Sequence, residues 1–272
     1  MPSSSLHSPA GDMDGDPTLA FYQDVLETLT QADIPFLVGG AYALSYYTAV
    51  VRPTKDLDLF IRRHDAERIG ETLRHAGYTM ETPYPHWLAK VRANGDLVDL
   101  IFSSGNGIAE VDDAWLEHAP KAAVLGVPVL ICPVEETIWS KAFIMERERY
   151  DGADIVHLLR ACSDRIDWHR LLRRFSFHWR VLLSHLTLFG FVYPAHRNMI
   201  PSWLMVELLD RLRQEALAQP TGQPICAGTL LSREQYLVDV EEQGYRDARI
   251  HPLGNMSEGE TAIWTEAISR KQ

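Results

Sequence analysis

The stretch from Val38 to Phe60, VGGAYALSYYTAVVRPTKDLDLF, decides the fold that we predict for this chain. It begins with Gly39 and Gly40 after an apolar run and ends in DLDLF, where polar and apolar side chains alternate. Such alternation is typical of a half-buried strand, so Asp56 and Asp58 share one face, with Cα atoms roughly 6.6 Å apart. Two carboxylates about 4 Å apart repel each other by about 4 kcal/mol at an effective dielectric near 20. The pair therefore predicts a bound cation, and ligation by oxygen alone suits Mg²⁺.

The two glycines predict contact with phosphate. Glycine permits a turn whose backbone N–H groups approach a phosphate, and the N-terminus of a following helix adds positive potential. Ala41–Ala49 is predicted to be that helix. An Asp-x-Asp strand alone is more often a solvated sheet edge, but a loop, a helix and a carboxylate strand in this order would hold a triphosphate between amide donors and a metal.

At this point the sequence resembles the nucleotidyltransferase superfamily with the polymerase-β-like fold, whose signature is hG[G/S], a helix and then Dh[D/E]h. The matching residues are Val38-Gly39-Gly40 and Asp56-Leu57-Asp58-Leu59. The tighter form R-x-T-x-D-[IL]-D-[ILV], found in the minimal and AbiEii-like bacterial branches, is matched by Arg52, Thr54, Asp56 and Asp58. Gly40 stands where many members have serine, so a side-chain hydroxyl for the phosphate is absent.

A third carboxylate is predicted at Asp99, the one charge inside the apolar strand Leu97–Phe102. Asn94–Gly95, just before it, is a strong hairpin signal. A buried carboxylate is costly unless it is paired or bound to a metal. One hypothesis is an ion pair across the hairpin with Lys90 or Arg92. The resemblance implies the other, in which Asp99 completes a triad with the two aspartates of the motif.

The helix predicted from Pro133 to Met145 carries Lys141, which resembles a recurrent lysine of the family and would meet triphosphate oxygens. Asp154 resembles a later recurrent aspartate and is a further candidate site residue. The alternatives are that residues 146–149 form a solvated ion-pair face and that Asp154 pairs with Arg147 or caps the next helix.

The resemblance implies an α+β fold: a small mixed β-sheet with flanking helices, followed by a helical C-terminal region. We expect a disordered N-terminal segment over residues 1–16, a nucleotidyltransferase domain over 17–160, and a mainly helical region with a turn-rich tail over 161–272. The sheet should have its helices on one face, and the strands of Asp58 and Asp99 should be neighbours.

The implied function is Mg²⁺-dependent transfer of a nucleoside monophosphate from an NTP, with ATP as the expected donor, to an acceptor hydroxyl or amine. Asp56, Asp58 and Asp99 would be the catalytic residues and the ligands of one or two Mg²⁺ ions. The nucleotide-binding residues would be Gly39, Gly40, Arg52, Thr54 and Lys141. The acceptor would be a small molecule such as an antibiotic, or tRNA or protein as in toxin-type relatives. The alternative is a non-catalytic nucleotide-binding or antitoxin-like partner, against which the intact triad argues, because a binding module does not need three carboxylates.

Composition agrees with a globular enzyme but does not identify one. The chain has 272 residues, 46% of them hydrophobic and 23% charged, with a formal net charge of −11 that disfavours broad nucleic-acid binding. The sequence has neither a membrane-length apolar run nor a signal-peptide core, and Cys132, Cys162 and Cys226 lack metal-type spacing. These features predict a cytoplasmic protein and leave its oligomeric state open.

The C-terminal region is predicted to be a helical bundle. Residues 167–175 place arginines on one side of a helix, Trp179–Phe191 is apolar enough to be buried, and Pro201–Gln214 is amphipathic. The arginines are Arg170, Arg173 and Arg174. A solvated helix face is the favoured interpretation, and a grip on an anionic acceptor such as RNA is the alternative.

Overall fold

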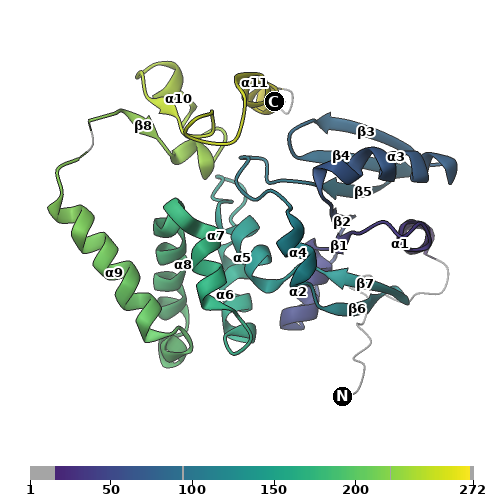
Figure 1. Ribbon diagram of the computed structural model, residues 1–272, viewed down its shortest axis with the longest axis horizontal. Helices are drawn as coiled ribbons and strands as arrows, with labels where there is room; N and C mark the ends of the chain where they lie inside the picture. Colours follow the sequence, from purple (N-terminus) through teal and green to yellow (C-terminus); the bar gives the residue numbers. More distant parts are fainter. Residues whose placement is uncertain (1–15, 94, 221, 270–272) are drawn as a thin grey trace. The chain divides into compact units, whose positions relative to one another are not determined.

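The strand of Asp56 and Asp58 lies in the middle of a mixed sheet (Figure 1). The structure, a computed structural model, describes residues 16–93, 95–220 and 222–269. Within these residues the sheet has seven strands in the order β3-β4-β5-β2-β1-β7-β6; β2 is parallel to β5, β1 is parallel to β7, and the other pairs are antiparallel. The predicted mixed sheet is therefore confirmed. The strands are β1 Leu37–Val38, β2 Asp56–Phe60, β3 Thr79–Tyr84, β4 Leu88–Ala93, β5 Asp96–Ile101, β6 Lys121–Val124 and β7 Val127–Ile131.

Helix α1 (Pro17–Gln31) covers the face of the sheet that points away from the carboxylates. Asp16 starts the helix by accepting a hydrogen bond from the Thr18 N–H, and Pro17 occupies its first turn. The Thr18 hydroxyl donates to Oδ1 of Asp96 at 2.9 Å. Because side chains alternate along β5, Asp96 and Asp99 point to opposite faces, which puts α1 behind the site.

The other helices of this part are α2 (Gly40–Thr48), α3 (Ala66–His75), which packs against α1, and α4 (Asp113–Glu117). The predicted helix Ala41–Ala49 is confirmed as α2. Its Tyr47 hydroxyl donates to the Cys132 carbonyl at 2.8 Å, which ties the helix to the residue after β7.

The chain divides into two compact units between Pro133 and Val134. Residue 160, the predicted end of the nucleotidyltransferase domain, lies inside helix α6 (Gly152–Cys162). This domain limit stays a prediction. The segment 1–16, predicted to be disordered, lies outside the described residues except for Asp16. Among the described helices, none combines the length and the apolar character that crossing a bilayer requires.

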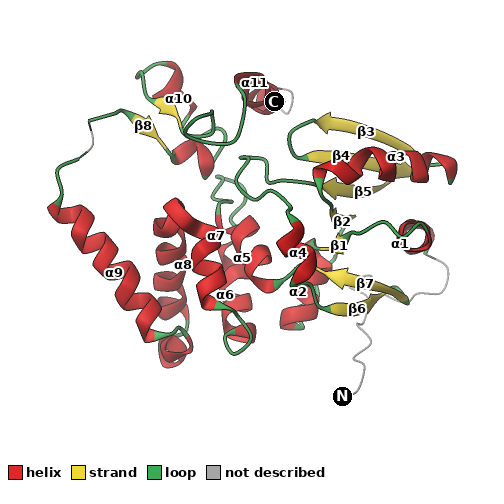
Figure 2. Cartoon of the chain, viewed as in Figure 1, coloured by secondary structure: helices red, strands yellow, loops and turns green. Residues whose placement is uncertain are grey.

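The second unit confirms the predicted helical C-terminal region, as Figure 2 shows. Its short strands β8 (Ile225–Cys226) and β9 (Arg246–Asp247) pair in parallel. Besides α6, its helices are α5 Val134–Ala142, α7 Trp168–Phe175, α8 Trp179–Val192, α9 Ser202–Leu217, α10 Leu237–Glu241 and α11 Glu258–Ser269.

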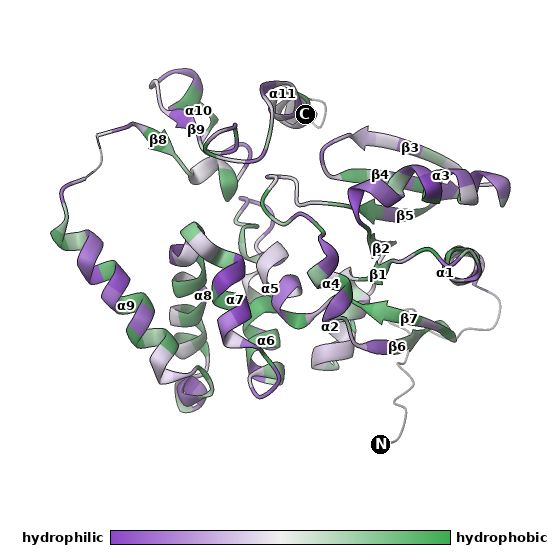
Figure 3. Cartoon of the chain, in the orientation of Figure 1, coloured by the Kyte–Doolittle hydropathy of each residue, from purple (hydrophilic) through white to green (hydrophobic). Residues whose placement is uncertain are grey.

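The prediction that Trp179–Phe191 is buried is wrong for one side of α8. Leu182, Leu186 and Phe189 are buried, but Phe191 is 82% exposed and Leu188 is 39% exposed. Figure 3 shows α8 as a mostly hydrophobic helix. A helix packs only the stripe that meets its neighbours, here α5, α6, α7 and α9, so apolar content alone overstates its burial.

The arginines of α7 were predicted to form a solvated face or an anion grip, and both predictions are wrong for two of them. Arg170 is 8% exposed and pairs with Glu135 and Glu136, while Arg174 donates to Oε1 of Glu136 at 2.8 Å. Arg173 alone of the three is exposed. The two glutamates are buried at the start of α5 and need cationic partners, which α7 supplies from about 35 residues downstream.

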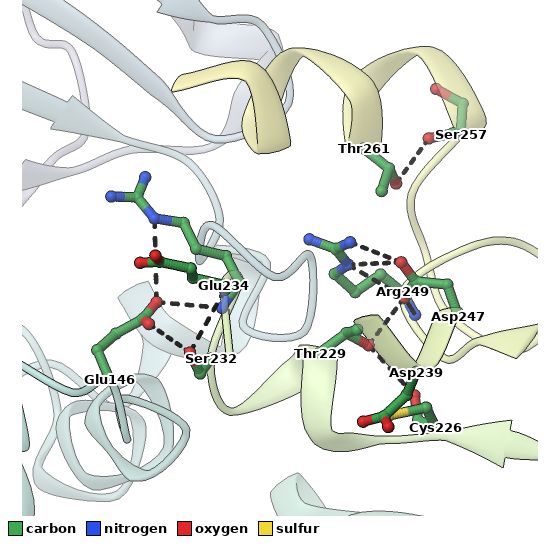
Figure 4. A network of polar contacts seen from close by, with 11 residues as sticks. Glu146, Cys226, Thr229, Ser232, Glu234, Asp239, Asp247, Arg249, Ser257 and Thr261 are labelled. Atoms are coloured by element: carbon green, nitrogen blue, oxygen red, sulfur yellow. Dashed lines mark hydrogen bonds and ion pairs between the residues drawn. The ribbon is translucent and has the colours of Figure 1, made fainter. Parts of the chain in front are cut away.

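The turn-rich tail also folds around a buried ion pair (Figure 4). Asp247 accepts hydrogen bonds from Arg249 through both carboxylate oxygens, at 3.0 Å from Nε and 2.6 Å from Nη2. The Thr229 hydroxyl adds a third donor at 2.8 Å. Side-chain exposure is 1% for Arg249 and 3% for Asp247, so this arginine is an internal structural residue.

Candidate active site

Three carboxylates meet on the face of the sheet opposite α1. Asp56 and Asp58 come from β2, and Asp99 on β5 is the register partner of Asp58. One ligand atom from each residue lies within 4.8 Å of the other two, and all three side chains are half-buried. The predicted adjacency of the two strands is therefore confirmed, and so is the predicted approach of Asp99 to the pair.

The local sequence explains why the carboxylates point outward together. Leu57 and Leu59 alternate with the aspartates along β2, and both are fully buried on the opposite face. Val98 and Leu100 do the same on β5. Burying each of these side chains stabilises the strand by about 1.5–3 kcal/mol, so a slip of one residue that exposed them would be expensive.

Thr54 fixes the first carboxylate. Its hydroxyl lies 2.9 Å from Oδ1 of Asp56 and 2.9 Å from the Asp56 carbonyl oxygen. The structure thus gives Thr54 a contact with a site residue, and its predicted contact with nucleotide stays a prediction. Arg52, two residues earlier, is exposed in the loop between α2 and β2, and its role in nucleotide binding also stays a prediction.

The glycine pair lies directly beside the second carboxylate. The Gly39 N–H donates to the Asp58 carbonyl at 2.9 Å, so this N–H serves the sheet and does not fit the predicted contact with phosphate. Gly40 is the first residue of α2, with φ of +53°. The first N–H groups of a helix have no partner within the helix, so the predicted phosphate contact fits Gly40 and the next turn better than Gly39.

Asp99 takes part in both of the arrangements that the sequence left open. Lys90 on β4 is its register partner, with Nζ 2.6 Å from Oδ1, and the same carboxylate belongs to the triad. Arg92 instead donates to Glu81 at 2.7 Å. Burial raises the pKa of Asp99; the hydrogen bond and charge of Lys90 oppose that rise, and the charge of Asp56 adds to it.

Lys141 lies in the second unit, in an ion-pair cluster of its own. Its Nζ is 3.0 Å from Oδ2 of Asp151 and 2.9 Å from Oδ2 of Asp154. Asp154 therefore pairs with Lys141, and the alternative partner Arg147 is wrong; Arg147 is exposed beside Glu148. Burial would raise the pKa of Asp151, but the hydrogen bond from Arg149 and the charge of Lys141 outweigh it and leave the pKa below its ordinary value.

Two features of the site were underrated by sequence reasoning. Lys90 was considered only as a rival to the metal hypothesis, whereas it occupies one oxygen of a carboxylate that also faces the pair. The closeness of Gly40 to Asp58, whose Oδ2 would lie 1.8 Å from a Cβ atom at Gly40, was not foreseen; its only sequence signal was the absence of serine at position 40. Both depend on register across strands, which a single sequence does not specify.

The geometry of the site agrees with a comparison of the chain with known families. The sequence profile of a family described as uncharacterised nucleotidyltransferases matches residues 18–179. The chain belongs to this family. The nucleotidyltransferase resemblance is thereby confirmed, and with it the enzyme class. No protein of curated function matches the chain.

The solved structures to which the chain is similar include an antibiotic-resistance factor, a nucleotidyltransferase-like protein and an adenylyltransferase. The antibiotic-resistance factor ANT(2'')-Ia has 18% identity and a TM-score of 0.43, with 61% of this chain and 95% of that chain covered. A nucleotidyltransferase-like protein from Paracoccidioides brasiliensis has 16% identity and a TM-score of 0.44, with 68% and 92% covered. The lincosamide adenylyltransferase LnuA has 12% identity and a TM-score of 0.36, with 53% and 96% covered. At these TM-scores the likenesses assign no acceptor to this chain.

Proposed function

We propose that this nucleotidyltransferase moves a nucleoside monophosphate from an NTP, preferentially ATP, to a hydroxyl or amine of a small-molecule acceptor in a Mg²⁺-dependent reaction. The observation that carries the proposal is the meeting of Asp56, Asp58 and Asp99 within 4.8 Å on one sheet face. In the reaction, the acceptor oxygen or nitrogen bonds to the α-phosphorus, the bond between the α-phosphorus and the bridging oxygen breaks, and pyrophosphate leaves.

The donor set fits Mg²⁺. Carboxylate oxygens are hard ligands, and Mg²⁺ in proteins is commonly bound by one or two carboxylates together with substrate phosphates. Three carboxylates this close on a rigid pair of strands repel one another unless a cation joins them. When bound there, one or two ions would neutralise charge on the triphosphate and on the leaving pyrophosphate.

The residues of the chain have separate tasks in this proposal. Asp56, held by Thr54, and Asp58 are the pair that faces the triphosphate through the metal site. The first turn of α2, from Gly40, offers N–H groups to phosphate oxygens. Asp99 completes the metal site or accepts the acceptor's proton; a raised pKa suits the second task, because a base works best when its pKa approaches the working pH.

The ion pairs made by the arginines of α7 favour a small-molecule acceptor over RNA. The arginines that sequence reasoning offered for RNA include Arg170 and Arg174, which are committed to Glu135 and Glu136 inside the second unit. The formal net charge of −11 points the same way. A cytoplasmic location belongs to the proposal; the wide spacing of Cys132, Cys162 and Cys226 in the sequence fits a reducing compartment.

The competing function is a nucleotide-binding partner without turnover. Two experiments on the full chain separate the hypotheses, and the first is titration with ATP. We expect ATP to bind in Mg²⁺ and to bind poorly in EDTA, because three carboxylates repel a free triphosphate and the ions invert the sign of the local charge. Equal affinity in EDTA would contradict the metal site.

Transfer is then measured with α-labelled ATP against aminoglycosides and lincosamides, an RNA pool and a protein extract, comparing wild type with Asp58→Asn. Label on a small molecule that disappears in Asp58→Asn supports the proposal. Label on RNA or protein would support nucleotidyl transfer but contradict a small-molecule acceptor. Binding without any transfer would favour the non-catalytic partner.

A further inference from the structure

The sheet face that bears the triad carries a row of charges that crosses four strands. Asp58 on β2 is in register with Asp99 on β5, Asp99 with Lys90 on β4, and Lys90 with Glu81 on β3. Register partners point to the same face, so these four side chains lie side by side. The row is negative, negative, positive and negative from the centre of the sheet toward its edge.

Lys90 is the cation of this row that touches the triad. Its Nζ lies 2.6 Å from Oδ1 of Asp99, and the two side chains are only 21% and 13% exposed. The short charge-assisted contact restrains the Asp99 carboxylate, since a group held through one oxygen loses rotation about its χ2. Asp99 meanwhile contributes an oxygen to the cluster with Asp56 and Asp58.

Charge arithmetic gives Lys90 a second effect. The three ionised carboxylates carry a charge of −3, and Lys90 reduces the total to −2. A unit positive charge this near the cluster repels an entering divalent ion, even while it orients one of its ligands. The triad therefore attracts a free ion less strongly than three carboxylates alone would. The negative charge of a bound triphosphate would supply the remaining attraction for the ion.

Resting on the proposed function, we propose that Lys90 is a positioning residue that orients Asp99 and weakens the affinity of the nucleotide-free triad for a divalent ion. It thereby couples metal binding to nucleotide binding. Its neighbour on the same face of β4, Arg92, acts on Asp99 more weakly than Lys90 does, because it is engaged with Glu81 in a pair that is about half exposed, at 49% and 50%.

The test measures the binding of Mn²⁺ alone to the full chain at pH 8. The electron paramagnetic resonance signal of the free ion reports how much Mn²⁺ remains unbound. Wild type is compared with Lys90→Met, Lys90→Arg and Arg92→Met, and thermal unfolding in EDTA verifies that each variant folds. We expect Lys90→Met to bind Mn²⁺ about tenfold more tightly or better, because removal of the nearby repulsive charge outweighs loss of the contact that orients Asp99. Lys90→Arg keeps the charge and should retain the wild-type affinity, and Arg92→Met should stay within about twofold of it.

A merely structural lysine predicts the opposite sign, because loss of a structural contact loosens the site. Unchanged or weaker Mn²⁺ binding by folded Lys90→Met would overturn the inference, as would an equal tightening in Arg92→Met. If Lys90→Met does not fold, Lys90→Gln, which can still hydrogen-bond Asp99 without a charge, decides on the same criterion. A comparison of wild type with Asp58→Asn distinguishes failure of the Lys90 inference from failure of the proposed metal site. If wild type binds Mn²⁺ and Asp58→Asn does not, the metal site is upheld even where the Lys90 variants contradict the inference. If wild type binds no Mn²⁺ with or without ATP, the metal site and the Lys90 inference are both overturned.

Discussion

A side chain on Gly40 would collide with Asp58, since a Cβ atom at Gly40 would lie 1.8 Å from Oδ2 of that aspartate. The backbone there has φ of +53°, in the left-handed region that glycine adopts most readily. Two separate physical reasons thus require glycine at the start of α2. The serine that many members of the superfamily carry at this position would not fit here unless Asp58 moved.

We expect Gly40→Ala to abolish Mn²⁺ binding and reduce transfer at least a hundredfold, because it displaces a carboxylate of the triad. Gly77→Ala is the matched control: Gly77 also has positive φ, +93°, but an added Cβ there meets nothing within 4 Å. It should cost about 1 kcal/mol of stability and leave metal binding unchanged. Equal Mn²⁺ affinity in both variants, measured by titration, would show that the closeness of Gly40 and Asp58 is irrelevant to the site.

Removal of single carboxylates should change metal-free stability in opposite directions. Unit charges 4.8 Å apart repel by about 3.5 kcal/mol at an effective dielectric of about 20, and closer charges repel more, so Asp58→Asn should raise the unfolding temperature in EDTA while it abolishes transfer. Asp99→Asn also relieves repulsion but leaves Lys90 without its charged partner, and it should lower that temperature. A shift of about 1 kcal/mol corresponds to about 2–4 °C for a chain of this size. Thermal unfolding of both variants in EDTA checks the signs, and a parallel change would contradict the charge row.

The core of the site could be predicted because its signal is local. The alternation in DLDLF specifies a strand and a face, and the hairpin signal before β5 supplies the neighbouring strand with its aspartate. The helix after Gly39–Gly40 follows from the same short segment. What the sequence could not specify was register, and register decides that Asp58, Asp99 and Lys90 form one row.

Helix α7 shows the opposite limit. Its arginines look like a solvated face when the helix is considered alone, because the glutamates that pair with Arg170 and Arg174 lie on α5. Buried ion pairs between distant segments leave no periodic signal in either helix. The exposed Phe191 on α8 is the complementary case, since an apolar residue predicts burial only if another element is there to cover it.

Lys141 permits a test that separates nucleotide binding from structure. If it contacts the triphosphate, Lys141→Met should weaken ATP binding in Mg²⁺ by about ten- to a hundredfold, the equivalent of a hydrogen bond to a charged group. It should also destabilise the second unit, because Asp151 and Asp154 are only 10% and 9% exposed and would face each other. Arg149→Met, which removes the second cation bound to Asp151, is the control for the structural effect. Isothermal titration that finds the same ATP affinity in both variants would reduce Lys141 to a structural role.

The Asp247–Arg249 pair should make the second unit sensitive to acid. Burial would raise the pKa of Asp247, but the hydrogen bonds and charge of Arg249 and the Thr229 hydroxyl outweigh it, so the pKa lies below its ordinary value of 3.8. A lowered pKa contributes stability that is fully present above 3.8 and is lost as pH falls through the folded value. Asp247→Asn should cost about 3–5 kcal/mol at pH 7, because it leaves a buried guanidinium without its counter-charge. The variant should also lose less stability than wild type between pH 4 and pH 2. Glu215→Gln, which breaks the exposed pair with Arg180, should cost no more than about 1 kcal/mol. Urea unfolding of the three proteins across this pH range provides the measurement, and parallel acid profiles for wild type and Asp247→Asn would exclude the pair as the source of the sensitivity.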